Sequence, residues 1–201
     1  MKNRLAYLFA LPLVLCLLVF SGFSYIPAKN PGPHGHCVMG LAPMRPGQKA
    51  SAILSYNCYA TFSNAIAVAS GGRTHLPANA TPRDLTRAML LHVASTPGSR
   101  NIFGVEFVDA NFGGASLTYF TNAGPCSSSM TYGVDSMPPG WNDVISSLYS
   151  DLYGCVWTRL WTDNDQSGAS QCYSGDTSYV GNVMNDQTSS IYWRPSGPNP
   201  C

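Results

Sequence analysis

The chain has 201 residues, of which only 10% are charged, and its formal net charge is +1. This length allows one well-formed hydrophobic core and a smaller companion unit. A near-neutral chain without a run of basic residues does not fit a protein whose main partner is nucleic acid. Glycine, proline and hydroxyl-bearing residues are abundant, which favours an extracellular, mainly β protein with a hydroxyl-rich surface.

Residues 1–28 have the design of a secretory signal peptide. Two basic residues precede an apolar run over residues 5–20, and small residues near Ser24 and Ala28 offer cleavage positions. An uncleaved membrane anchor is the alternative, because the apolar run approaches the length of a span. We therefore expect an extracellular protein without stable membrane insertion after cleavage.

Removal of the signal peptide, which contains Cys16, leaves six cysteines. An even number of cysteines in a secreted chain predicts three disulfides. Cys155–Cys172 is expected because these cysteines flank one predicted hairpin nearly symmetrically, and Cys37–Cys58 is expected because the two are close in sequence. Cys126–Cys201 then follows by exclusion. No spacing is CxxC, which argues against a structural zinc site.

Residues 29–100 are predicted to form a small α+β segment with two short helices. Short apolar runs at residues 37–41 and 52–54 indicate strands. The apolar spacing over residues 58–70 predicts the first helix. The second is expected over residues 81–94, where Thr81, Pro82 and Asp84 form the sequence signature of a capping box.

Residues 101–195 are rich in short β-type runs separated by turns. Residues 102–107 predict a strand, 109–114 a turn and 117–120 the returning strand, and the pattern resumes at 155–160. Evenly spaced short strands of this kind predict a β-sandwich. Residues 196–201 are expected to form a tail.

Two segments inside this region occur twice and in the same order. The sequence N-D-x-x-S-S stands at residues 142–147 and again at 185–190. Each is preceded by an aromatic residue, four further residues, a large residue, one residue and Gly-Ala-Ser, at 107–116 and 161–170. Four matched segments in one order indicate an internal duplication.

These residues resemble the βγ-crystallin domain, which consists of two Greek-key motifs packed as a β-sandwich. Each motif of that family has an early aromatic hairpin and a late N/D-N/D-x-x-S/T-S calcium clamp. Gln166 departs from the pattern, because the family usually has an aromatic residue there. Phe107, Phe112 and Trp161 are expected to pack over the hairpins rather than to bind a ligand.

The resemblance implies that calcium is the cofactor and that the two clamps are crossed. One loop then supplies a carboxylate to one ion and a serine hydroxyl to the other. The implied site residues are Asn142, Asp143, Ser146, Asn185, Asp186 and Ser189. The two asparagines are expected to shape the turns by bonding to their own backbone. One carboxylate per site predicts weak binding, on the order of 10⁻⁵ to 10⁻³ M.

The sequence does not indicate an enzyme. It contains no HExxH, GxSxG or P-loop motif, and its four histidines lie outside the β-rich region. A secreted calcium-binding protein with a structural or protective role is therefore the first hypothesis.

Two alternatives of the same fold remain open, because a fold does not decide function. One is an antimicrobial protein of killer-toxin type. The other is a secreted proteinase inhibitor, which would bind an extracellular protease through an exposed, proline-stiffened loop at residues 136–141. Trp141 in this loop, like Trp193, is expected to be partly exposed.

Overall fold

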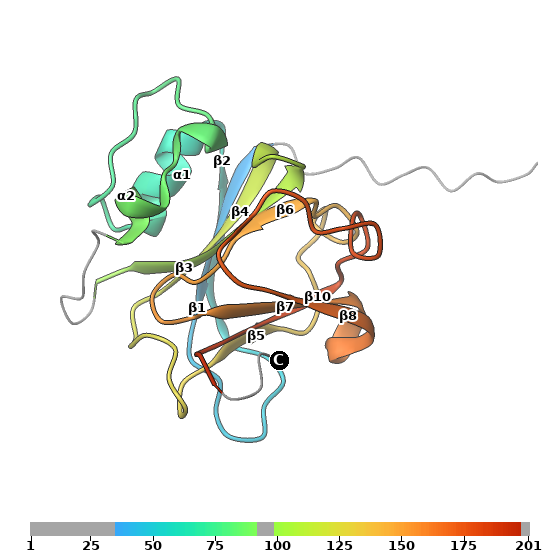
Figure 1. Cartoon of the computed structure of the whole chain (residues 1–201). Helices are drawn as coiled ribbons and strands as arrows, with labels where there is room; N and C mark the ends of the chain where they lie inside the picture. Colours follow the sequence, from blue (N-terminus) through green and yellow to red (C-terminus); the bar gives the residue numbers. More distant parts are fainter. Residues whose placement is uncertain (1–34, 92–98, 198–201) are drawn as a thin grey trace, which may run out of the picture.

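The computed structural model describes residues 35–91 and 99–197 (Figure 1). The predicted signal peptide, the end of the predicted second helix and Cys201 lie outside these residues. Among the described residues, none of the helices is both long enough and apolar enough to span a bilayer.

The chain folds into two β-sheets that face each other across a large hydrophobic core. The first sheet has the order β2 (Ile53–Tyr59), β1 (His36–Leu41), β4 (Gly113–Thr121), β3 (Asn101–Asp109), β6 (Ser147–Tyr149) and β9 (Asp176–Thr177). The second has the order β5 (Tyr132–Val134), β10 (Ser190–Arg194), β7 (Trp157–Asp163) and β8 (Ser167–Tyr173). The 3₁₀ turn η2 (Asn164–Gln166) joins β7 to β8.

The order of the strands repeats the duplication seen in the sequence. Strands β3 to β6 form one four-strand motif and β7 to β10 form another. In each motif the fourth, first and second strands are neighbours in one sheet, while the third strand lies in the other sheet. This exchange of third strands makes each sheet depend on both motifs. The predicted mainly β sandwich of two Greek keys is confirmed.

The strand registers of the two motifs are also equivalent. Phe107 on β3 stands opposite Ser147 on β6, and Trp161 on β7 stands opposite Ser190 on β10. Both hairpins carry an irregularity directly after that aromatic residue, before Asp109 in one motif and before Asp163 in the other. The duplication therefore extends to backbone detail, and it places corresponding loops at corresponding positions.

The N-terminal segment joins the sandwich instead of standing apart from it. Strand β1 pairs in parallel with β4 and antiparallel with β2, so two strands are added to the first sheet. Helices α1 (Phe62–Ala69) and α2 (Arg87–Leu91) cover the outer face of that sheet (Figure 1). Apolar residues of α1 pack there with Val105 and Phe107 in a second core.

The boundaries of the predicted helices need correction. The first begins at Phe62 rather than near residue 58, because β2 continues to Tyr59 and Thr61 caps the helix by accepting a bond from the Asn64 amide. The second is not continuous over residues 81–94. A 3₁₀ turn, η1 (Pro82–Asp84), carries the predicted capping box, and extended backbone at Leu85 separates it from α2.

One of the three predicted disulfides is confirmed, between Cys37 and Cys58. The predictions of Cys155–Cys172 and Cys126–Cys201 are wrong, because Cys126 pairs with Cys155. The register of β7 and β8 places Cys172 opposite Arg159, so the turn that holds Cys155 lies away from it. That turn instead meets the other motif, where the Cys126 amide donates to the Tyr153 carbonyl. Cys172 is also in a disulfide.

The prediction of an exposed loop at residues 136–141 is wrong in its main feature. Trp141 is 0% exposed and belongs to the core between the sheets, and Met137 is 6% exposed. The Met137 amide donates to the Ser189 carbonyl, which holds the loop against the second motif. Trp193 is likewise fully buried, between the rings of Phe103 and Tyr119. An inhibitory loop that presents Trp141 to a protease is therefore not available.

We expect Trp141→Ala to lower the free energy of unfolding by about 3–5 kcal/mol, because it leaves a large cavity in the core. Pro139→Ala, at an exposed position of the same loop, should cost less than about 1 kcal/mol. Urea unfolding of both variants measures the difference. Equal stabilities would contradict the burial of Trp141.

One polar side chain points into the core between the sheets. Glu106 stands opposite Leu117 and Leu148, which both belong to that core, and it is 0% exposed. Within the described part of the chain, neither of its carboxyl oxygens has a hydrogen-bond partner. Burial raises the pKa of Glu106 well above its ordinary value. The duplication places Leu160 at the equivalent position of the second motif.

This burial predicts an unusual dependence of stability on pH. The folded pKa of Glu106 is raised, so its protonated form favours folding most below the ordinary value of 4.5. Stability should fall by about 1.4 kcal/mol per pH unit as the pH rises from that value towards the folded pKa. Glu106→Leu should abolish this slope and raise stability at neutral pH. Denaturant unfolding of both proteins from acid to neutral pH, in chelator, checks the prediction, and parallel profiles would contradict it.

Candidate metal centre

The two N-D-x-x-S-S segments lie against each other, although 37 residues separate them in sequence. The Ser189 hydroxyl donates to Asp143 Oδ1 at 3.2 Å. The Ser146 hydroxyl lies 3.5 Å from Asp186 Oδ1. Each aspartate is therefore next to the first serine of the other segment, which is the crossed arrangement that the resemblance implied.

Backbone hydrogen bonds join the two segments in the same reciprocal way. The Asp143 amide donates to the Thr188 carbonyl at 3.0 Å, and the Asp186 amide donates to the Ile145 carbonyl at 3.1 Å. Both aspartates have left-handed backbone, with φ of 59° and 55°. Aspartate tolerates this conformation better than most residues. The tight turn aims its carboxylate at the neighbouring segment.

The Asn142 side chain takes a different role from the one expected. The Asn142 side chain donates to Asp143 Oδ2 at 2.7 Å, so it orients the carboxylate of the next residue rather than its own backbone. Asn185 is held through its backbone amide, which donates to the Gly181 carbonyl. A fixed carboxylate loses little conformational freedom when it binds an ion.

The oxygen-bearing side chains of the two clamps differ in how deeply they are buried. Ser146 and Ser189 are each 5% exposed, whereas Asp143 is exposed and Asp186 is half-buried. The serine hydroxyls thus form the floor, and the carboxylates reach the surface, where an ion could enter with part of its water shell.

The chemistry of the donor set favours a hard cation. Among the described residues, no three side chains of histidine, cysteine, aspartate or glutamate gather as a metal-binding group. Each clamp instead combines one carboxylate, a serine hydroxyl and the carbonyls of a tight turn. Calcium accepts about six to eight such oxygens, whereas nitrogen and sulfur ligands suit zinc and related metals. Water would have to complete each coordination shell.

The second serine of each clamp has a separate role that the sequence analysis missed. The Ser147 hydroxyl donates to the Asp109 carbonyl at 2.6 Å and accepts from the Phe112 amide at 3.0 Å. In the other motif, the Ser190 hydroxyl makes the equivalent bonds to Asp163 and Gln166, at 2.7 and 3.1 Å. Each clamp is therefore tied to the aromatic hairpin of its own motif. The identity of both serines in the two copies was the available signal.

The hairpin aromatics pack as expected in the first motif, and the departure at Gln166 has a structural partner in the second. Phe112 stacks on Tyr149 with ring centroids 4.4 Å apart. The Gln166 side-chain amide instead donates to the Lys49 carbonyl, in the loop between β1 and β2. The aromatic residue is thus replaced where the N-terminal segment crosses the second hairpin.

No protein-family model and no curated protein matches this chain. Solved βγ-crystallin domains are similar to it. The domain from Clostridium beijerinckii is 25% identical, covers 47% of this chain and 99% of its own length, and has a TM-score of 0.36.

Two further βγ-crystallin domains show the same pattern. The domain from Flavobacterium johnsoniae is 24% identical over 48% of this chain and 98% of its own, with a TM-score of 0.34. That from Ciona intestinalis is 22% identical over 46% and 98%, with a TM-score of 0.32. All three are of the family that the sequence resembles.

We expect the two serines of one clamp to differ when they are replaced. In the presence of a chelator, Ser147→Ala should lower the free energy of unfolding by about 1–3 kcal/mol, because it removes two partly buried hydrogen bonds to the hairpin, each worth about 0.5–1.5 kcal/mol. Ser146→Ala makes the same chemical change one residue away, and should cost less than about 1 kcal/mol, because its contact is long. Thermal and urea unfolding measure both, and an equal loss would contradict the division of roles.

Proposed function

We propose that the protein is a secreted calcium-binding protein with a structural or protective role outside the cell, and that it acts without catalysis. The single observation that carries this proposal is the reciprocal contact of Ser189 with Asp143 and of Ser146 with Asp186. Two oxygen-lined clamps that each draw on both motifs would let bound ions staple the motifs together.

The clamp residues divide the work of holding an ion. Asp143 and Asp186 would supply the charge, Ser146 and Ser189 would supply neutral oxygens from the opposite segment, and Asn142 would orient its neighbouring carboxylate. A bound calcium ion supplies a concentrated positive charge that no side chain of the site carries. With one carboxylate per clamp, affinity is expected on the order of 10⁻⁵ to 10⁻³ M, so that millimolar extracellular calcium would fill about half of the sites or more.

Two disulfides support the extracellular part of the proposal, since such bonds persist in oxidising compartments. They pin Cys37 to Cys58 across β1 and β2, and Cys126 to Cys155 within the first motif and the start of the second. The burial of Met137 and Trp141 takes away two of the side chains that the inhibitor alternative would have presented to a protease. Calcium binding is therefore the better supported function.

The proposal predicts that calcium stabilises the folded protein through both clamps. At a calcium concentration of 100 times Kd, one site contributes about 2.7 kcal/mol. Asp143→Asn or Asp186→Asn should each remove most of one contribution, and asparagine is chosen because it tolerates the left-handed backbone. Asp135→Asn, an exposed aspartate outside the clamps, is the control for the change in net charge. Calorimetric calcium titration and thermal unfolding measure these effects. No shift of the melting temperature at millimolar calcium in the parent protein would reject the proposal.

The crossed contacts give a sharper test of geometry. In Asp186→Asn the remaining strong site is built on Asp143, whose serine partner is Ser189. Adding Ser189→Ala to this variant should weaken calcium binding more than adding Ser146→Ala. In Asp143→Asn the ranking should reverse. If each serine instead affected calcium binding at the aspartate of its own segment, the crossed arrangement would be rejected even though calcium binds.

A further inference from the structure

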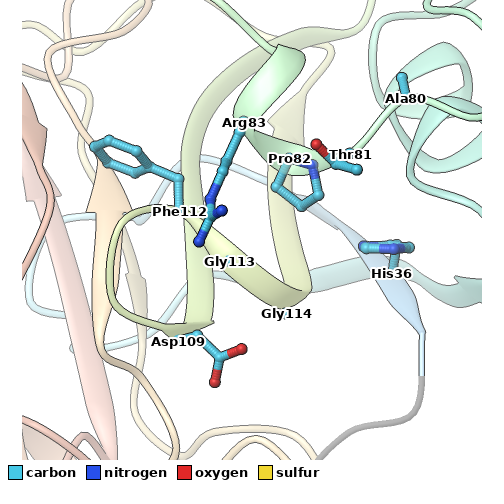
Figure 2. A pocket seen from close by; sticks show the side chains of 9 residues that line it. All are labelled: His36, Ala80, Thr81, Pro82, Arg83, Asp109, Phe112, Gly113 and Gly114. Carbon is cyan, nitrogen blue, oxygen red and sulfur yellow. The ribbon is translucent and has the colours of Figure 1, made fainter.

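A cavity of about 400 Å³ lies between the N-terminal segment and the first hairpin, and none of the six proposed metal-binding residues of the clamps is in its lining (Figure 2). Its walls come from β1, from the turn that carries η1, and from the ends of β3 and β4. A cavity of this size falls in the range of small-molecule sites. Figure 2 shows Arg83 extending from η1 towards Gly113, with His36 on the other side of Gly114.

Two opposite charges line this cavity without neutralising each other directly. Arg83 Nε donates to the Asn111 carbonyl at 3.2 Å, which anchors the guanidinium. Its two terminal nitrogens are left to donate to a ligand. Asp109 lies on the hairpin side of the same cavity. Over residues 35–91 and 99–197, no ion pair joins Arg83 to Asp109. The cavity therefore offers strong hydrogen-bond donors and acceptors at separate points.

The third titratable group of the cavity is an uncharged imidazole. His36 Nδ1 lies 3.0 Å from the Ser116 hydroxyl, and the ring packs edge-on against Phe62. Burial lowers the pKa of His36, which keeps the ring neutral at neutral pH. The lining thus has one cation and one anion, and its charges sum to zero.

Both walls of the cavity are held in place before any ligand arrives. On one side, the Thr81 amide and hydroxyl both donate to Asp84 Oδ2, at 2.7 and 2.9 Å. On the other side, Ser147 holds the Asp109 carbonyl and the Phe112 amide. Preformed walls reduce the entropy that a ligand must overcome on binding.

The duplication shows that the floor of the cavity is specific to the first motif. Gly113 has Ser167 as its counterpart in the second hairpin. A Cβ atom at Gly113 would lie 3.2 Å from Asp109 Cβ and 3.6 Å from Arg83 Nη2. A side chain at this position would occupy the space beneath the guanidinium, and glycine keeps that space open.

We propose that this cavity binds a neutral saccharide, through one or two sugar rings. Neighbouring hydroxyl groups can donate to both oxygens of Asp109 and can accept from the guanidinium of Arg83, so a polyol satisfies both groups at once. Pro82, whose ring lies between Arg83 and His36 in the lining, adds an apolar surface for the C–H face of a ring (Figure 2). The zero sum of charges favours neither an anion nor a cation, which distinguishes this ligand class from phosphates and amines.

The test is a titration of the ¹⁵N-labelled mature protein, followed by NMR, in chelator so that calcium binding does not contribute. The probes are glucose, galactose, mannose, N-acetylglucosamine, maltose and cellobiose, up to about 50 mM. At least one should shift the amides of Thr81, Arg83 and Gly113 saturably. Arg83→Ala and Asp109→Asn should each weaken that binding about tenfold. Gly113→Ser, which copies the second hairpin, should abolish it.

The duplication also supplies the matched control. Asp163→Asn changes the counterpart of Asp109 in the second hairpin and should leave saccharide affinity unchanged. Melting temperatures of all variants identify any that are unfolded, and Arg83→Lys then replaces Arg83→Ala as the test of bidentate donation. Absence of saturable shifts at the cavity with every saccharide would overturn the proposal. So would unchanged affinity in folded Arg83 and Asp109 variants, or binding of acetate or glycine in place of the sugars.

Discussion

The two halves of this protein meet through a pair of reciprocal hydrogen bonds between the clamp segments. The Asp143 amide donates to the Thr188 carbonyl of the second segment, and the Asp186 amide donates to the Ile145 carbonyl of the first. These bonds require left-handed backbone at both aspartates, and that conformation in turn sets the direction of both carboxylates. Ser147 and Ser190 then extend the connection from each clamp to its own hairpin. The pairing of the motifs and the construction of the candidate metal centre are therefore one structural feature.

The N-terminal segment changes the symmetry of this arrangement. It adds two strands to one sheet and covers that sheet with helices, while the second sheet gains only the loop that holds Lys49. The first hairpin acquires a neighbour, η1, and with it a walled cavity above Gly113. The second hairpin gives up an aromatic residue for Gln166, whose amide bonds to the passing loop. Each departure from the duplication thus occurs where the added segment makes contact.

Glu106 is a departure of another kind. Its counterpart Leu160 lies in the core between the sheets, which shows that an apolar residue fits this position of the motif. A carboxylic acid at the equivalent point of the first motif costs stability when it ionises, because the core offers it no solvent. Tyr119, which is also buried, feels the same environment, and the pKa of its phenol is raised by burial and by the nearby carboxyl. The first sheet therefore carries a buried carboxyl group whose ionisation depends on pH, and the described residues of the second sheet include none.

Local pattern determined much of this protein from sequence alone. The duplication, the two-Greek-key sandwich, the capping box at Thr81 and the disulfide between Cys37 and Cys58 depend on short-range spacing or on repetition, which a sequence displays directly. Ser147 and Ser190 were visible as identities between copies, but the sequence did not show that they hold the hairpins. Tertiary structure alone decided that Cys126 pairs with Cys155, because strand register sets which turns meet. It also decided that Trp141 is buried, since the exchange of third strands between sheets closes the core over a loop whose prolines and glycine had indicated an exposed turn.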